Sequence, residues 1–185
     1  MNDEEARAET TAWLSNRRKV AESLFEVPHK VTSKIVKYRY NPALEYLTKH
    51  ASGKDYVLKS RQLYITTYYC LTDLLSAVYY PNYSSLLLCN RDDDAKIYYD
   101  IYKYFYNQMP PEIEIVTGYK FPFKQKLLTD NLHLLEFEHV DEEGNSLGSS
   151  YLRLQGAQAL TLGRGFRINN LHVQEIAIFD QDYAK

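Results

Sequence analysis

The sequence predicts an α/β domain in which helices flank a mainly parallel sheet. Short apolar runs alternate with amphipathic runs of helix length between residues 55 and 108, which is typical of strand–helix–strand units with parallel strands. Prolines close the helical runs, with Pro81 after one and Pro110-Pro111 after the next. A chain of 185 residues that is 45% hydrophobic and 25% charged can bury one substantial core.

The first fifty residues are expected to be mainly helical. An apolar stripe predicts an amphipathic helix from Glu4 to Phe25, and Pro28 is expected to end it. Residues 30–40 have a polar, extended pattern. Asn41 can cap a helix and Pro42 loses no hydrogen bond at a first helical position, so a short helix is expected to run to about His50.

The central region predicts a strand, a loop and a helix, and then a strand and a helix again. Residues 55–58, Asp-Tyr-Val-Leu, have the pattern of a short buried strand. The chain leaves this strand through residues 59–65 and enters a helix from about Thr66 to Tyr80. Residues 85–89 form a second apolar strand, and Asn90 or Asp92 is expected to cap a helix that runs to about Gln108.

The C-terminal region predicts strands. Residues 113–116 form a third short strand, and residues 132–140 and 150–154 are expected to pair as a hairpin joined across residues 141–145. This hairpin is expected to be an insertion in the strand–helix alternation. Leu171-His172-Val173 forms a last strand, and Gln174-Glu175 follow it at once.

Composition excludes several classes of function. The net charge of −2 leaves no overall basic surface, so any contact with DNA or RNA is expected to be local. Cys70 and Cys89 lie in apolar runs typical of buried thiols, and the histidines lack the spacing of a zinc site. No apolar run approaches the roughly 18 residues that span a bilayer, so we expect a soluble, intracellular protein without membrane contact.

Two predicted strand ends carry the candidate chemistry. Ligands of open α/β sheets bind at the carboxyl ends of the strands, where helix N-termini carry positive partial charge. Lys59 and Arg61 follow one strand and could neutralise phosphates, and Thr66 or Thr67 could hold Mg²⁺ at the helix start. The same segment also fits a plain strand-to-helix loop that Thr66 caps, with both cations in solvent.

Two segments resemble one known family. Residues 59–67, Lys-Ser-Arg-Gln-Leu-Tyr-Ile-Thr-Thr, resemble the Walker A variant K-x-R-Q-x-G-x-[ST]-[ST] of the large terminase subunit of tailed bacteriophages. Residues 163–177 are similar to that family's R-G segment and its Walker B strand, L-H-[VI]-[SD]-E-[IV]-A. Residues 40–43 and 85–95 resemble the family's segments before and after the phosphate loop, and the resemblance covers roughly residues 30–182.

The resemblance implies a P-loop NTPase fold that binds ATP and Mg²⁺. Lys59 would neutralise the β- and γ-phosphates, and Arg61 would add a catalytic cation for the charge of the transition state. Thr66 and Glu175 would hold Mg²⁺, and Glu175 would also orient or activate the attacking water. The nucleotide-binding residues would be Lys59, Ser60, Arg61, Gln62, Thr66 and Thr67.

The same resemblance implies the ATPase motor of a phage terminase, which drives DNA into a procapsid in the host cytoplasm. Residues 1–40 would be an N-terminal helical arm, and residues 41–185 an ATPase core without the family's C-terminal nuclease domain. The partners would be DNA, which this chain alone would bind weakly, a portal protein, the small terminase subunit and further copies of the chain.

Three positions depart from the family pattern. Tyr64 stands where the family has Gly, Leu44 where it has a Gln that reads adenine, and Gln174 where it has Asp or Ser. A side chain at position 64 is unfavourable if the loop requires a positive φ. The departures leave open a divergent ATPase or a catalytically degenerate remnant that acts as an interaction module. An unrelated α/β binding domain is a third alternative.

Overall fold

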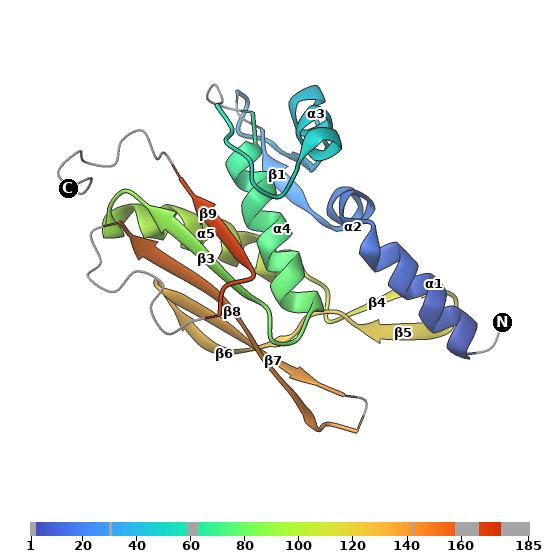
Figure 1. Ribbon diagram of the computed structural model, residues 1–185. Coiled ribbons are helices and arrows are strands. Elements are labelled where there is room, and N and C mark those ends of the chain that lie inside the picture. The colour runs from blue at the N-terminus through green and yellow to red at the C-terminus, as the bar shows by residue number, and fades with distance from the viewer. Residues whose placement is uncertain (1–2, 30, 59–62, 142, 158–166, 175–185) are drawn as a thin grey trace.

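The computed structural model describes residues 3–29, 31–58, 63–141, 143–157 and 167–174 (Figure 1). Within these residues, a five-stranded sheet, two separate two-stranded ribbons and five helices are present. The helices are α1 (Asp3–Ser15), α2 (Arg17–Leu24), α3 (Pro42–His50), α4 (Ile65–Tyr79) and α5 (Asp92–Gln108). The strands are β1 (Glu26–Pro28), β2 (Ile35–Lys37), β3 (Ser84–Cys89), β4 (Glu112–Val116), β5 (Tyr119–Pro122), β6 (Lys126–Asn131), β7 (Leu134–Val140), β8 (Ser146–Gly156) and β9 (Asn170–Val173).

The main sheet has the strand order β6-β7-β8-β3-β9. β3 pairs in parallel with β8 and with β9, whereas β6, β7 and β8 are joined by antiparallel pairs. The α/β class is therefore confirmed, but the sheet is mixed rather than mainly parallel. The predicted hairpin of residues 132–140 and 150–154 is present as β7 and β8. It is not an insertion, because β8 lies in the middle of the sheet beside β3.

Helices α4 and α5 pack on the same face of this sheet. His139 on β7 and Ser150 on β8 both hydrogen-bond the carbonyl of Ala77 in α4. Phe137 on β7 packs against the ring of Tyr106 in α5, with the ring centroids 5.7 Å apart. The core lies between this helical layer and the sheet. Its most deeply buried side chains include Leu44, Cys70, Leu74, Leu87, Cys89, Tyr102, Phe105, Leu135, Phe137, Leu152 and Leu154.

Local signals explain where α3 and α5 begin. The side chain of Asn41 accepts a hydrogen bond from the backbone N–H of Leu44 at 2.9 Å, and Pro42 occupies the first helical position, as predicted. Helix α5 begins at Asp92, and the carboxylate of Asp94 accepts a bond from the N–H of Arg91 at 3.2 Å. The acidic first turn suits the positive end of the helix dipole.

The predicted N-terminal helix of residues 4–25 is two helices. Asn16 separates them, and its side chain caps α2 by accepting a hydrogen bond from the N–H of Lys19 at 3.0 Å. Helix α2 ends at Leu24, before Pro28, because the chain turns there into β1, which pairs with β2. The first forty residues therefore contain a small ribbon as well as helices.

Two segments predicted as strands of the main sheet are not part of it. Residues 55–58 form no strand, and the side chains of Tyr56 and Leu58 are 92% and 104% exposed. A short apolar run does not by itself supply a pairing partner, and none is present at this place. The strand predicted at residues 113–116 exists as β4, but it pairs with β5 in a separate ribbon that lies against α1. None of the helices in the described residues is both long and apolar enough to cross a bilayer.

Candidate functional site at the start of α4 and the end of β9

The two segments with candidate chemistry meet in the folded chain. The hydroxyl of Thr66, in the first turn of α4, donates a hydrogen bond to Oε1 of Gln174 at 3.3 Å, across 108 positions of sequence. Gln174 directly follows β9 and continues its pairing, because its N–H donates to the carbonyl of Leu88 at 2.8 Å. The contact therefore lies at the carboxyl edge of the parallel strands, where ligands of α/β sheets bind.

The amide of Gln174 has a defined orientation. Gln174 is buried, and its Nε2 contacts Nε2 of His172, which lies two residues earlier on the same face of the strand. An amide has its donor on nitrogen and its acceptor on oxygen, so the nitrogen at His172 directs the oxygen toward Thr66. Gln174 thus accepts a hydrogen bond from the Thr66 hydroxyl, as a carboxylate at this position would, and lone pairs on the Thr66 oxygen remain available to a cation.

His172 also contacts an aromatic ring. The ring of Tyr69, on α4, lies 4.8 Å from the imidazole of His172 between centroids. Burial raises the pKa of Tyr69, so its phenol stays protonated at neutral pH. His172 was not among the predicted site residues. The period of two along a strand could have identified it, because residues 172 and 174 share one face.

Tyr64 adopts the backbone conformation that a glycine supplies easily. Its φ and ψ are 58° and 14°, in the left-handed region, and it is the residue before the first turn of α4. Its hydroxyl donates to the carbonyl of Pro28 at 3.0 Å. The tyrosine therefore keeps the turn that places Thr66 and Thr67 in the first turn of the helix, where backbone N–H groups have no partner within the helix.

The segment before α4 is tied to the start of α3. Asn41 donates from Nδ2 to the carbonyl of Leu63 at 3.1 Å, while its Oδ1 caps α3. Leu44, the position at which the resemblance expects an adenine-reading glutamine, is completely buried in the core. A side chain at position 44 therefore faces the protein interior and not a ligand.

Other predicted site residues lie outside the described residues: Lys59, Ser60, Arg61, Gln62 and Glu175. Of the predicted set, the structure brings together Thr66 and the residue before Glu175, and it places Thr67 beside Thr66. No group of three or more His, Cys, Asp or Glu side chains that could hold a metal occurs in the residues that the structure describes. A cation here would depend on the Thr66 hydroxyl, on bound phosphate and on water.

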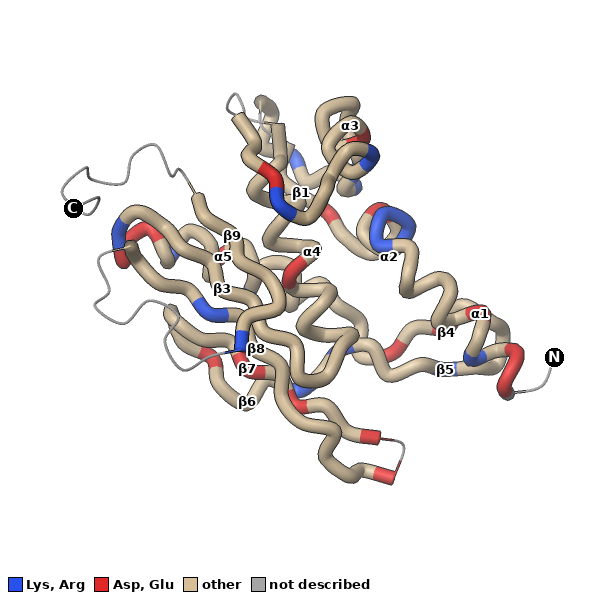
Figure 2. The backbone as a smooth tube through the Cα atoms, in the orientation of Figure 1, with Lys and Arg blue, Asp and Glu red and all other residues tan. Residues whose placement is uncertain are grey.

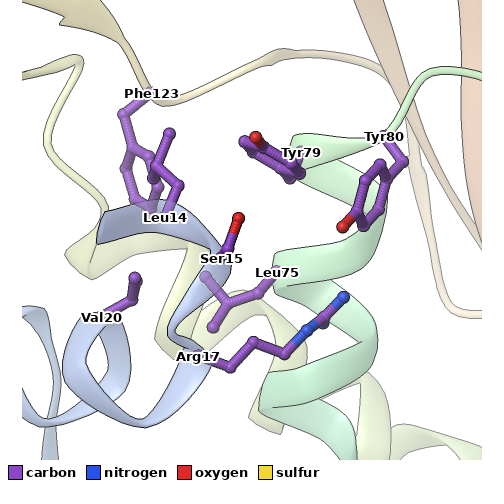
Figure 3. A pocket seen from close by; sticks show the side chains of 8 residues that line it. All are labelled: Leu14, Ser15, Arg17, Val20, Leu75, Tyr79, Tyr80 and Phe123. Atoms are coloured by element: carbon purple, nitrogen blue, oxygen red, sulfur yellow. The ribbon is translucent and has the colours of Figure 1, made fainter. Parts of the chain in front are cut away.

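Two hollows near α4 do not coincide with this contact. A cavity of about 20 Å³, enough for one water molecule, lies between the α1–α2 corner and the last turns of α4, where Arg17 points toward Tyr80 (Figure 3). A wider groove of about 590 Å³ is lined by Tyr40 and Tyr68, among others. Arg18 at its rim already pairs with Glu45 at 2.9 Å, so its charge is compensated.

Comparison with protein-family models and with curated proteins gives no match to this chain.

Proposed function

We propose that the chain binds ATP and Mg²⁺ at the start of α4 and the end of β9, as the ATPase core of a terminase-like DNA-packaging motor. The observation that supports this proposal is the hydrogen bond between Thr66 and Gln174. It joins the helix start that resembles a Walker A segment to the strand end that resembles a Walker B segment. In a P-loop NTPase fold, these two segments have to meet.

Each residue of the proposed site has a role in binding or hydrolysis. The Thr66 oxygen would ligate Mg²⁺ while Gln174 accepts a hydrogen bond from the Thr66 hydroxyl. Thr67 lies beside Thr66 in the first turn of α4. Lys59 and Arg61 would neutralise phosphate charge, and Ser60 and Gln62, their neighbours in sequence, would also contact the nucleotide. Glu175 would help to hold Mg²⁺ and would orient the attacking water. ATP supplies the phosphoanhydride bond whose hydrolysis drives movement of DNA.

The assembled motor would act with a portal protein, a small terminase subunit and further copies of this chain in the host cytoplasm. Charged residues of both signs are interspersed along the described part of the backbone (Figure 2), and the net charge of the sequence is −2. The chain alone would therefore hold DNA only weakly, and the other subunits would supply the remaining contacts.

A second candidate function is that of a non-enzymatic interaction module, a terminase-like remnant that has the fold of the ATPase but no catalytic activity. Two observations favour it. Gln174 is an uncharged amide at a position where a carboxylate would help to hold the Mg²⁺ shell, and Leu44 is buried and unable to read a base. Binding of a portal or small terminase subunit without any affinity for ATP would support this alternative.

Calorimetric titration of ATP, with and without Mg²⁺, into the wild type and three variants tests the first proposal. We expect Thr66→Ala to weaken Mg²⁺-dependent binding roughly tenfold or more, which corresponds to about 1.4 kcal/mol. Thr66→Ser retains the hydroxyl and should bind as the wild type does. Gln174→Ala should weaken binding less than Thr66→Ala. Equal ATP affinity of wild type and Thr66→Ala would contradict the proposed site, and no binding by any of the four proteins would favour the interaction module.

A further inference from the structure

Asp73 is a buried carboxylate in the middle of α4, where it contacts Asn170, the first residue of β9. Its side chain is 2% exposed, and Oδ1 accepts hydrogen bonds from Nδ2 of Asn170 at 2.6 Å and from the hydroxyl of Tyr83 at 3.1 Å. The hydroxyl of Tyr102 lies 3.5 Å from Oδ2. One carboxylate in α4 therefore contacts β9, the segment before β3, and α5.

No cation compensates this carboxylate directly. In the described part of the chain, no Lys or Arg forms an ion pair with Asp73. Arg17 is nearby, but it donates to the carbonyl of Thr72 at 2.8 Å and to the hydroxyl of Ser76 at 2.5 Å. Burial raises the pKa of Asp73 to about 6, although the bonds from Asn170 and Tyr83 lower it in part. A buried carboxylate held by neutral donors is costly, so its benefit has to lie in the position of the groups that it binds.

Three contacts connect α4 to β9 in a regular ladder. Thr66 meets Gln174, Tyr69 meets His172, and Asp73 meets Asn170, so that the helix and the strand run in opposite directions. Thr66 and Asp73 are seven residues apart, which is about 10 Å along a helix. Asn170 and Gln174 are four residues apart, which is about 13 Å along a strand. The two hydrogen bonds therefore attach the beginning and the end of β9 to the middle and the first turn of α4.

The position of β9 needs such a determinant. It is a four-residue strand at the edge of the sheet, and within the described residues it pairs only with β3. A slip of one residue would turn both His172 and Gln174 to the opposite face and remove the contact with Thr66. Asn170 is the first residue of the strand, so a bond at Asn170 fixes the register from its beginning.

We propose that Asp73 is a positioning residue for the candidate nucleotide site: through Asn170 it fixes the register of β9 on α4, which places Gln174 against Thr66. That a nucleotide binds at this place rests on the proposed function. The positioning of Gln174 is independent of it and can be measured without any ligand.

Hydrogen exchange of the backbone amide of Gln174, followed by NMR, is the direct test. In Asp73→Ala we expect this amide to exchange roughly tenfold faster or more, because the strand loses a hydrogen bond to a charged group. Asp73→Asn keeps the shape and one acceptor oxygen, so it should retain most of the protection. Asn170→Ala removes the other partner of this hydrogen bond and should have the same effect as Asp73→Ala. It replaces Asp73→Ala in the experiment if Asp73→Ala does not fold.

Ser150→Ala is the matched control, because it removes a buried side-chain hydrogen bond to α4 from β8, which β3 separates from β9 in the sheet order. It should change exchange at Gln174 only as much as it changes global stability. Exchange at Gln174 that is the same in Asp73→Ala as in the wild type, or altered only as in Ser150→Ala, would overturn the proposal. Titration of ATP and Mg²⁺ then tests the link to function: Asp73→Ala should bind more weakly and Asp73→Asn almost as well as the wild type. If the wild type binds no ATP, the proposed function fails, and the exchange experiment still decides the positioning role.

Discussion

The hydroxyl of Tyr64 donates to the carbonyl oxygen of Pro28 at 3.0 Å, so the residue with left-handed backbone before α4 is anchored to the end of strand β1. A non-glycine residue at a φ of 58° is under strain of about 1 kcal/mol. The bond to Pro28 and the packing of the ring against the core offset this strain. Tyr64 therefore carries backbone strain that a glycine would avoid, and in return it forms a tertiary hydrogen bond that a glycine could not form.

The first prediction concerns Tyr64→Gly. Glycine adopts a positive φ without strain, so the substitution relieves the backbone before α4 and we expect the affinity for ATP and Mg²⁺ to rise. The gain should disappear in a Lys59→Ala background, because the relieved loop helps only if a cation holds the phosphate there. Calorimetric titration of the four proteins measures this coupling. Tyr64→Phe, which loses only the hydroxyl, is the control and should not gain affinity; a glycine variant that binds no better than the wild type would disprove the steric argument.

The second prediction concerns Leu44→Gln, which introduces the residue that the large terminase subunit family, which this sequence resembles, has at this position. Because Leu44 is fully buried, the amide would lie in the core, and we expect a loss of about 2–5 kcal/mol in the free energy of unfolding. Leu44→Met conserves volume and should cost less than about 1.5 kcal/mol. Urea unfolding followed by circular dichroism compares the two. A glutamine variant as stable as the wild type, with higher ATP affinity, would show that position 44 can face a ligand.

The third prediction concerns the pH dependence of stability through Asp73. Its pKa in the folded chain is about 6, above the ordinary value of 3.8, so the folded state holds more proton between these pH values. Stability from this group is therefore highest at low pH and decreases as the pH rises from about 4 to about 6, by up to about 3 kcal/mol. Asp73→Asn cannot titrate and should lack this decrease. Parallel pH profiles of unfolding free energy for the two proteins would contradict the expectation.

The fourth prediction concerns His139, whose effect has the opposite sign. His139 is buried and its Nε2 lies 2.9 Å from the carbonyl of Ala77 and 3.0 Å from the hydroxyl of Ser150. Burial lowers the pKa of His139 below its ordinary value of 6.5, although the bond to Ala77 raises it in part. The folded state then binds fewer protons than the unfolded chain, so stability falls as the pH falls below 6.5. Thermal unfolding of the wild type and of His139→Gln is compared between about pH 5 and about pH 7.5, a range that brackets the ordinary histidine pKa of about 6.5. The loss of stability should occur in the wild type alone.

The fifth prediction concerns DNA. Because the net charge is −2 and basic side chains occur only in local groups, binding of DNA by the chain alone should be weak and steeply dependent on salt. Fluorescence anisotropy with a labelled duplex across a salt series measures both properties. A tight complex that is insensitive to salt would disagree with this expectation and would require a binding surface other than exposed cations.

The sequence by itself determined the elements whose signals are local. Asn41 and Pro42 define the start of α3, Pro81 follows α4, and β3 contains the apolar run of residues 86–89. These features depend on side chains within a few residues of each other, so reading along the chain identifies them. The resemblance, which has Gly at position 64, raised the question of a positive φ there, and the backbone of Tyr64 has one.

Only the tertiary structure decided how distant segments are paired. The apolar run of residues 55–58 has the pattern of a strand, but its side chains are exposed, because a strand also needs a neighbour that the pattern does not name. The place of β8 beside β3, and of β9 at the sheet edge, arises from packing across the whole domain. The contacts of Asp73 with Asn170 and of Thr66 with Gln174 exist only once β9 is placed there, and 97 and 108 positions separate the partners. Local preference cannot specify such pairs, because the free energy that selects them comes from burial and hydrogen bonding between elements that meet only in the folded chain.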